Sequence, residues 1–215
     1  MDVRVVCISR TIAAGGEVIG RAVAERLGFR YVDEEVVTQA AKKARVDPKV
    51  VAAAEHKQPL IKRLIESLGS AQGIPDPLGF PTGLPPEPYY PAGIPLQPVL
   101  PEDHRAMIRE AIQEIATQGR AVIVAHAASM ALGGMAGVLR ELVTASPETR
   151  AQRLEAAGEK DGTAAVAASD KERRDYFRSF YRIKEELPTH YDVVINTDKL
   201  APEQALQAIL AVAGE

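Results

Sequence analysis

Residues 9–20, SRTIAAGGEVIG, contain the feature that determines the fold class: a glycine pair between a short apolar run and an amphipathic helix. Before the pair, Val3 to Ile8 is rich in Val and Ile, which is typical of a buried strand. After it, the apolar spacing over residues 18–27 predicts a helix, which Gly28 ends. A loop of this kind presents unpaired N–H groups and the positive end of the helix dipole, so phosphate is its best occupant.

The side chains of this loop depart from the usual phosphate-loop pattern, GxxxxGK(S/T). With Gly16 as the second glycine, Thr11 replaces the first glycine, Glu17 replaces the lysine and Val18 replaces the hydroxyl residue. A carboxylate near a triphosphate repels it, and loss of the hydroxyl removes the usual Mg²⁺ ligand. By itself the pattern is also compatible with a plain tight turn before a helix.

The composition is that of an ordinary globular protein: 215 residues, 46% hydrophobic, 26% charged, with a net charge of −3 and a pI near 5.9. This balance gives no case for nucleic acid or an anionic membrane as a partner. The four histidines are scattered without zinc-ligand spacing, and Cys7 reads as a small buried hydrophobe. No apolar stretch reaches the roughly 18 residues of a membrane span, and residues 1–9 do not resemble a signal peptide, so we expect a cytoplasmic protein.

The rest of the chain alternates strands with helices. Further strands are predicted at residues 29–32, 121–125, 139–144 and 191–197, and further helices at 33–44, 102–118, 147–156, 164–184 and 202–212. Because the strands are mostly continuously apolar, they predict a parallel sheet with helices on both faces, an α/β fold.

The segment from about Gly69 to Pro101 interrupts this pattern. It holds ten of the chain's 15 prolines, which excludes helix and interior strand. A linker is one interpretation. Because its apolar side chains are too many for a pure spacer, a flap over a site or an arm that packs on a partner subunit fits at least as well.

Four stretches together resemble the cytidylate kinase-like family, a branch of the P-loop nucleoside monophosphate kinases. They are ISRTIAAGGEVIGRAVAERLGFRYVDEEVV, GRAVIVAHAASMAL, VTASPETRAQRL with SDKERRDYFRSFY, and YDVVINTDKLAPEQALQAI. The resemblance implies a three-layer α/β/α P-loop fold in a single domain over residues 1–215. Residues 45–105 would form an inserted helical and Pro-rich acceptor or flap region, and residues 150–185 a basic, lid-like region.

The resemblance also implies an activity: transfer of the γ-phosphoryl group of ATP, with Mg²⁺, to a nucleoside monophosphate or another small acceptor. Ala14, Gly15 and Gly16 would bind the phosphates through their amides. Arg10, which matches the family's Ser-Arg, and Asp33, which ends the second strand, are the expected catalytic residues. Arg10 could instead be a solvated or capping arginine, and Asp33 the N-cap of the next helix.

The basic cluster around the lid is expected to close on the phosphates and exclude water; its members are Arg150, Arg153, Arg173, Arg174 and Arg178. The same residues could form an exposed, salt-bridged helix. His126 stands with Ala125 where the family usually has Gly-Arg, at the carboxyl edge of the sheet, and is the expected acceptor-binding residue. It could equally be structural.

The sequence leaves two alternatives to a kinase, one based on the loop and one on the apolar side chains of the Pro-rich arm. A non-catalytic nucleotide-binding or interaction protein would keep the fold without the chemistry, as Glu17, Val18 and the Ala125-His126 pair suggest. A homodimer formed through the Pro-rich arm, without a ligand, is the other.

Overall fold

In the computed structural model, which describes residues 2–44, 101–125 and 127–214, five parallel strands form one sheet in the order β2-β3-β1-β4-β5. The strands are β1 (Val5–Arg10), β2 (Arg30–Val32), β3 (Ala121–Val124), β4 (Val138–Thr144) and β5 (Val193–Asn196). The central strands β1 and β3 are almost entirely buried, as expected of strands covered on both faces. The predicted α/β class with a parallel sheet is therefore confirmed.

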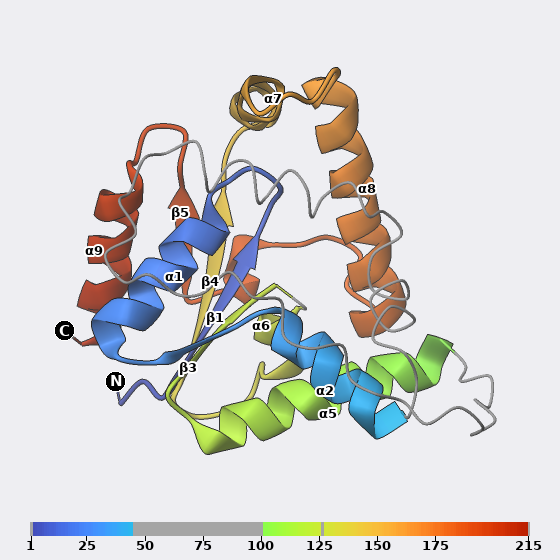
Figure 1. The fold of residues 1–215 in the computed structure, drawn as a ribbon, viewed down its shortest axis with the longest axis vertical. Helices are drawn as coiled ribbons and strands as arrows, with labels where there is room; N and C mark the ends of the chain where they lie inside the picture. The colour runs from blue at the N-terminus through green and yellow to red at the C-terminus, as the bar shows by residue number, and fades with distance from the viewer. Residues whose placement is uncertain (1, 45–100, 126, 215) are drawn as a thin grey trace, which may run out of the picture.

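Helices cover both faces of the sheet and its carboxyl end (Figure 1). They are α1 (Gly16–Leu27), α2 (Glu34–Ala44), α5 (Pro101–Gln118), α6 (Ala128–Ala131), α7 (Pro147–Ala156), α8 (Gly162–Tyr181) and α9 (Pro202–Ala213), with a 3₁₀ turn at Pro188–His190. Every helix predicted within the described residues is present, with ends shifted by at most three residues. The short α6 and the 3₁₀ turn were not predicted.

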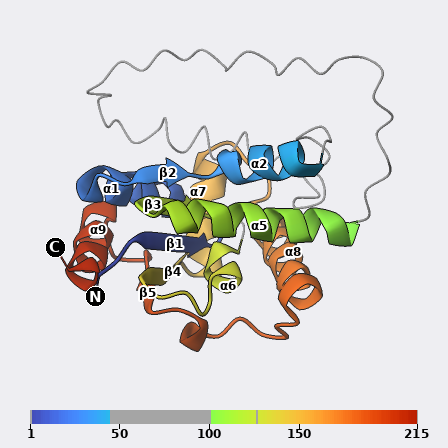
Figure 2. The ribbon, with the colours of Figure 1, turned by 90° about the horizontal axis from the view of Figure 1, so that it is seen from below.

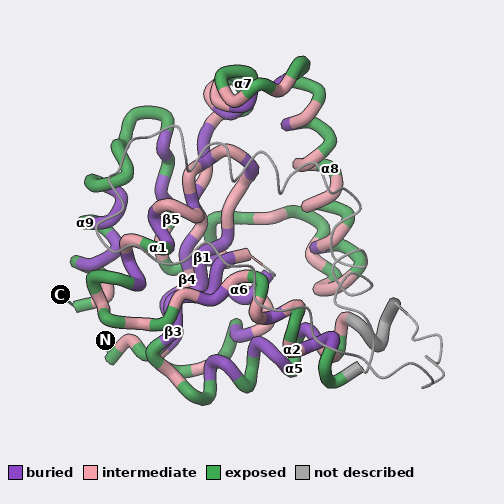
Figure 3. Tube along the Cα trace, in the orientation of Figure 1, coloured by how far each residue is buried: buried purple, intermediate pink, exposed green. Residues whose placement is uncertain are grey.

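The core consists of two layers separated by the sheet. On one face α2, α5 and α6 pack against alternate residues of β1 and β3, including Val5, Cys7 and Ile123. On the other face α1 and α9 pack against the intervening residues, including Val6, Ile8 and Val122. The view from below separates these layers (Figure 2), and buried positions run along the strands and the inner face of α5 (Figure 3). The three-layer α/β/α arrangement is thus as expected.

A third, smaller cluster joins the carboxyl end of the sheet to α7 and α8. Ile12 of the glycine loop packs there with Ala151 and Leu154 of α7 and Val166 of α8. Both helices lie beyond the ends of the central strands (Figure 1), so the glycine loop has helical neighbours from the basic, lid-like region.

The predicted inserted region, residues 45–105, lies outside the described residues up to residue 100.

None of the helices in the described ranges is long and apolar enough to cross a membrane.

Candidate functional site: the glycine loop between β1 and α1

The loop between β1 and α1 leads directly into the N-terminus of helix α1. Ala13 and Gly15 both adopt left-handed conformations, with φ of 58° and 83°, and the Ala14 amide donates to the Thr11 carbonyl at 3.2 Å. Helix α1 begins at Gly16 after the N-cap residue Gly15, and within the described residues no side-chain cap bonds its first turn. The N–H groups at the start of α1 therefore remain for a ligand, at the positive end of the helix dipole.

Arg153 of helix α7 binds the backbone of this loop. Its Nη1 donates to the Ala13 carbonyl at 3.0 Å and to Thr197 Oγ1 at 3.1 Å, and its Nη2 donates to the Thr197 carbonyl at 2.6 Å. Thr197 Oγ1 in turn donates to the Ala14 carbonyl at 2.9 Å. Two consecutive loop carbonyls are thus bound to side chains, which fixes the loop backbone before any ligand arrives.

All three acceptors of Arg153 are uncharged. Within the described part of the chain no carboxylate forms an ion pair with it. Since the side chain is partly buried, its positive charge acts on the loop with less screening than an exposed arginine would have. Arg153 therefore contributes net positive charge where it contacts the glycine loop, at the Ala13 carbonyl.

Arg10 and Glu17 meet on the loop. Arg10 Nε lies 2.5 Å from Glu17 Oε1, and both side chains are only 15% exposed. The stem of Arg10 crosses Gly16 so closely that a β-carbon there would lie 2.7 Å from Arg10 Cβ. Glycine at position 16 is therefore required by the path of the Arg10 side chain.

A second polar group lies beside this pair, at the end of β2. The Tyr31 hydroxyl donates to Asp33 Oδ2 at 3.4 Å, and the Arg21 guanidinium lies 4.2 Å from the centroid of the Tyr31 ring. Burial raises the pKa of Tyr31, and the Asp33 carboxylate raises it further, whereas Arg21 and Arg10 act in the opposite direction. The hydroxyl consequently stays neutral and remains a donor to Asp33.

Asp33 also precedes helix α2, and its carbonyl accepts the Val36 amide at 3.1 Å. It thus occupies the place of an N-cap, as one of its two interpretations predicted. Of the two expected catalytic residues, Asp33 therefore accepts a hydrogen bond from Tyr31, whereas Arg10 pairs with Glu17.

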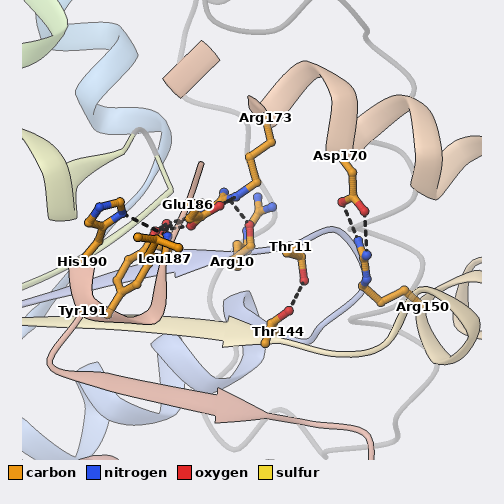
Figure 4. Close-up of polar contacts among 11 residues, drawn as sticks. Arg10, Thr11, Thr144, Arg150, Asp170, Arg173, Glu186, Leu187, His190 and Tyr191 are labelled. Atoms are coloured by element: carbon orange, nitrogen blue, oxygen red, sulfur yellow. Dashed lines mark hydrogen bonds and ion pairs between the residues drawn. The ribbon is translucent and has the colours of Figure 1, made fainter. Parts of the chain in front are cut away.

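Arg173 of α8 is the centre of a network at the end of β1 (Figure 4). Its Nε and Nη2 bind the two carboxylate oxygens of Glu186 at 2.7 and 2.6 Å, and its Nη1 donates to the Arg10 carbonyl at 2.9 Å. The Tyr191 hydroxyl donates to the same carboxylate, and Ser9 Oγ accepts from Arg173 Nη2 at 2.8 Å. The last carbonyl of β1, directly before the loop, is therefore also held by an arginine.

The remaining arginines of the lid-like region have different surroundings. Arg150 is buried and forms a bidentate pair with Asp170, with both N···O distances 2.7 Å (Figure 4). Arg174 and Arg178 are exposed on α8, where both lower the pKa of Asp175, although its hydrogen bond from Lys171 is the larger cause. Of the expected phosphate-binding arginines, Arg153 thus contacts the loop backbone, Arg173 contacts the end of β1 before the loop, and Arg150 joins α7 to α8.

The turn after β3 keeps a backbone that favours glycine. Ala125 and Ala127 have φ of 66° and 49°, although neither is glycine. Such strain is consistent with the expectation that relatives carry Gly at this turn. His126, the expected acceptor-binding residue, lies outside the described residues.

Sequence reasoning did not single out Thr197, Glu186 or Tyr31. Thr197 and Glu186 act on the loop through contacts with residues distant in the chain, so no local pattern marks them. Tyr31 stands in the tyrosine-x-aspartate stretch that supported the family resemblance, and its spacing from Asp33 was the available signal.

Comparison with known proteins identifies the family of this chain. The model of the cytidylate kinase-like family matches residues 5–199. The chain belongs to that family. A search of curated protein sequences found no match.

Solved structures share the fold of this cytidylate kinase-like protein over nearly its whole length. An uncharacterized protein from Eubacterium ventriosum has a TM-score of 0.62 at 15% identity, covering 98% of both chains. Shikimate kinase from Bacteroides thetaiotaomicron has 0.51 at 13% identity, covering 97% of both. A sugar kinase from Janibacter sp. has 0.51 at 14% identity, covering 97% of this chain and 93% of the other. At these identities the likeness shows the kinase-type P-loop fold.

Proposed function

We propose that the protein binds the phosphates of ATP on the loop at residues 13–16 and transfers the γ-phosphoryl group to a nucleoside monophosphate or another small acceptor. The observation that carries this proposal is the loop itself. It has two left-handed residues before a helix whose N-cap residue makes no side-chain hydrogen bond, and its Ala13 and Ala14 carbonyls are held by Arg153 and Thr197. Phosphoryl transfer depends mainly on positioning and charge stabilisation, and a preorganised loop supplies both.

Within this proposal, the amides around Ala14, Gly15 and Gly16 bind phosphate, and Arg10 stabilises the charge that develops during transfer. Arg150 and Arg173 would have to leave bidentate carboxylate partners to bind phosphate directly. Arg174 and Arg178, which have no such partner in the described residues, are better suited to approach a bound nucleotide.

Mg²⁺ prefers oxygen ligands and usually keeps several waters alongside one or two carboxylates and the substrate phosphates. Position 18 offers no hydroxyl, and Glu17 is paired with Arg10, so Asp33 is the residue that we assign to the ion. The donor set fits a hydrated ion held largely by phosphate. Bound there, Mg²⁺ would neutralise charge on the phosphates, while Asp33 would also orient the acceptor.

The second candidate is a non-catalytic nucleotide-binding protein with the same fold. It is favoured by the Arg10–Glu17 pair, which leaves no net charge where a phosphate loop normally carries lysine. The two candidates predict different outcomes for the same assay.

The assay is ADP production from ATP and Mg²⁺ in the presence of each nucleoside monophosphate in turn, followed by a panel of small alcohol and phosphate acceptors. The proposal predicts acceptor-dependent ADP release that Asp33→Asn lowers by roughly a hundredfold or more. Nucleotide binding without turnover on any acceptor would favour the second candidate. Turnover that is unchanged in Asp33→Asn would remove Asp33 from the mechanism.

A further inference from the structure

Glu17 occupies the position at which a phosphate loop normally carries its lysine, yet its carboxylate is not free to face a ligand. Its Oε1 lies 2.5 Å from Arg10 Nε, and the pair is largely shielded from water. An ion pair shielded in this way holds its geometry more firmly than one on the surface. Glu17 therefore acts on the loop together with Arg10.

The nearest contact of this ion pair is made by Arg10 Nε, which forms no hydrogen bond within the described residues. Within the described residues, no acceptor is bound to Nη1 or Nη2 of Arg10, and these are the two nitrogens that form the fork suited to phosphate. Such a fork binds anions well only when its long side chain is held in place, because an unrestrained arginine loses rotamer entropy on binding.

The rest of Arg10 is fixed at two further points. Its stem lies against Gly16, where the absence of a side chain makes room for it, and its backbone carbonyl accepts from Arg173 Nη1 at 2.9 Å. Its side chain thus runs from the end of β1 across the first residue of α1, and Glu17 fixes the far end. That path brings a cation to the N-terminus of α1, where the amides of the loop can donate to an anion.

We propose that Glu17 is a positioning residue, which holds Arg10 so that its two terminal nitrogens bind a phosphate group on the loop. Arg10, from the preceding strand, thereby supplies the cation that the loop's own position 17 lacks. This inference rests on the proposed function, since it requires that phosphate binds at the loop. It reverses the simple electrostatic expectation that removing the Glu17 carboxylate improves binding.

The test is the affinity for pyrophosphate and for ATP with Mg²⁺, measured by titration calorimetry on the full chain. Glu17→Ala is compared in two backgrounds, one with Arg10 present and one with Arg10→Ala. With Arg10 present, Glu17→Ala should weaken pyrophosphate binding by roughly tenfold, the equivalent of one charge-assisted hydrogen bond. In the Arg10→Ala background the same change should strengthen binding, because only the repulsion of the carboxylate is then removed.

Glu17→Gln serves as the conservative variant, and it also covers the case in which Glu17→Ala does not fold. Its amide oxygen can take the place of Oε1 beside Arg10 Nε without the negative charge, so affinity should stay within about threefold of wild type with Arg10 present. In the Arg10→Ala background, Gln should strengthen binding much as Ala does.

The sign of the Glu17→Ala effect decides the outcome. Opposite signs in the two backgrounds support the positioning role. The same sign in both overturns it: strengthening in both means that Glu17 only repels phosphate, and weakening in both means that it only stabilises the loop. If wild type binds neither pyrophosphate nor ATP, the proposed function itself is overturned and this inference with it.

Discussion

Replacing Glu141 by glutamine should change the pH dependence of the protein's stability. Glu141 lies in β4, is fully buried, and has no hydrogen-bond partner for either carboxylate oxygen within the described residues. It shares a sheet face with Leu139 and Val143, which pack against α1 and α9. Burial, and to a smaller extent the Asp192 carboxylate, raise the pKa of Glu141 from the ordinary 4.5 to about 8.

The sign and size of the effect follow from proton linkage. Between pH 4.5 and 8 the carboxyl is protonated in the folded protein and ionised in the unfolded chain, so unfolding releases a proton. The free energy of unfolding therefore falls by up to about 1.4 kcal/mol per pH unit across this window. Between pH 4.5 and pH 7 the total loss is roughly 3 kcal/mol. Below the window the penalty is absent, and above it the penalty is constant.

The assay is urea unfolding of wild type and Glu141→Gln at half-unit steps from pH 5 to pH 9. The variant should lack this contribution, so its advantage over wild type should grow with pH and level off above about pH 8. The slope is compared rather than the absolute value, because a buried amide carries its own pH-independent cost. Glu155→Gln, at an exposed position of α7, is the matched control and should leave the slope unchanged. A constant difference between wild type and Glu141→Gln across the whole range would refute this reasoning.

Two further predictions concern the loop. Arg153→Ala should lower the free energy of unfolding by about 2 kcal/mol and weaken pyrophosphate binding, since the Ala13 and Thr197 carbonyls lose their donors; unchanged affinity in calorimetry would show that the loop does not need this support. Gly16→Ala should cost about 1–3 kcal/mol in chemical unfolding, because the new β-carbon meets the Arg10 stem at 2.7 Å. At Gly134 a new β-carbon would meet no atom of the described residues within 4 Å, so Gly134→Ala should change the free energy of unfolding by no more than about 0.5 kcal/mol. An equal loss in both variants would contradict the close approach of Arg10 to Gly16.

The sequence predicted the elements well because their determinants are local. Helix α7 begins as expected, since Ser146 caps it through the Thr149 amide and Pro147 occupies its first position. The continuous apolar runs of β1 and β3 likewise marked buried parallel strands. Helix α6 was missed because four residues are too few to show a period.

The contacts that make the site could not be predicted in the same way. Arg153 reaches Ala13 across 140 positions of sequence, and Arg173 reaches Arg10 across 163. The family resemblance suggested phosphate binding for both arginines, but only the folded arrangement shows that Arg153 holds a loop carbonyl and Arg173 the last carbonyl of β1. The pairing of Glu17 with Arg10 is closer in sequence, yet it depends on the turn at Gly15 and Gly16, whose geometry a pattern does not define.

A thermal-shift titration tests whether phosphate binds at the glycine loop. Pyrophosphate, ATP and adenosine are each added with and without Mg²⁺, adenosine being the control that lacks phosphate. A ligand present at a hundredfold excess over its Kd adds about 2.7 kcal/mol of apparent stability. We expect Tm to rise with pyrophosphate and with ATP, and to rise more for ATP with Mg²⁺ than without it. Adenosine should change Tm little. No shift with either phosphate ligand, or an equal shift with adenosine, would contradict it.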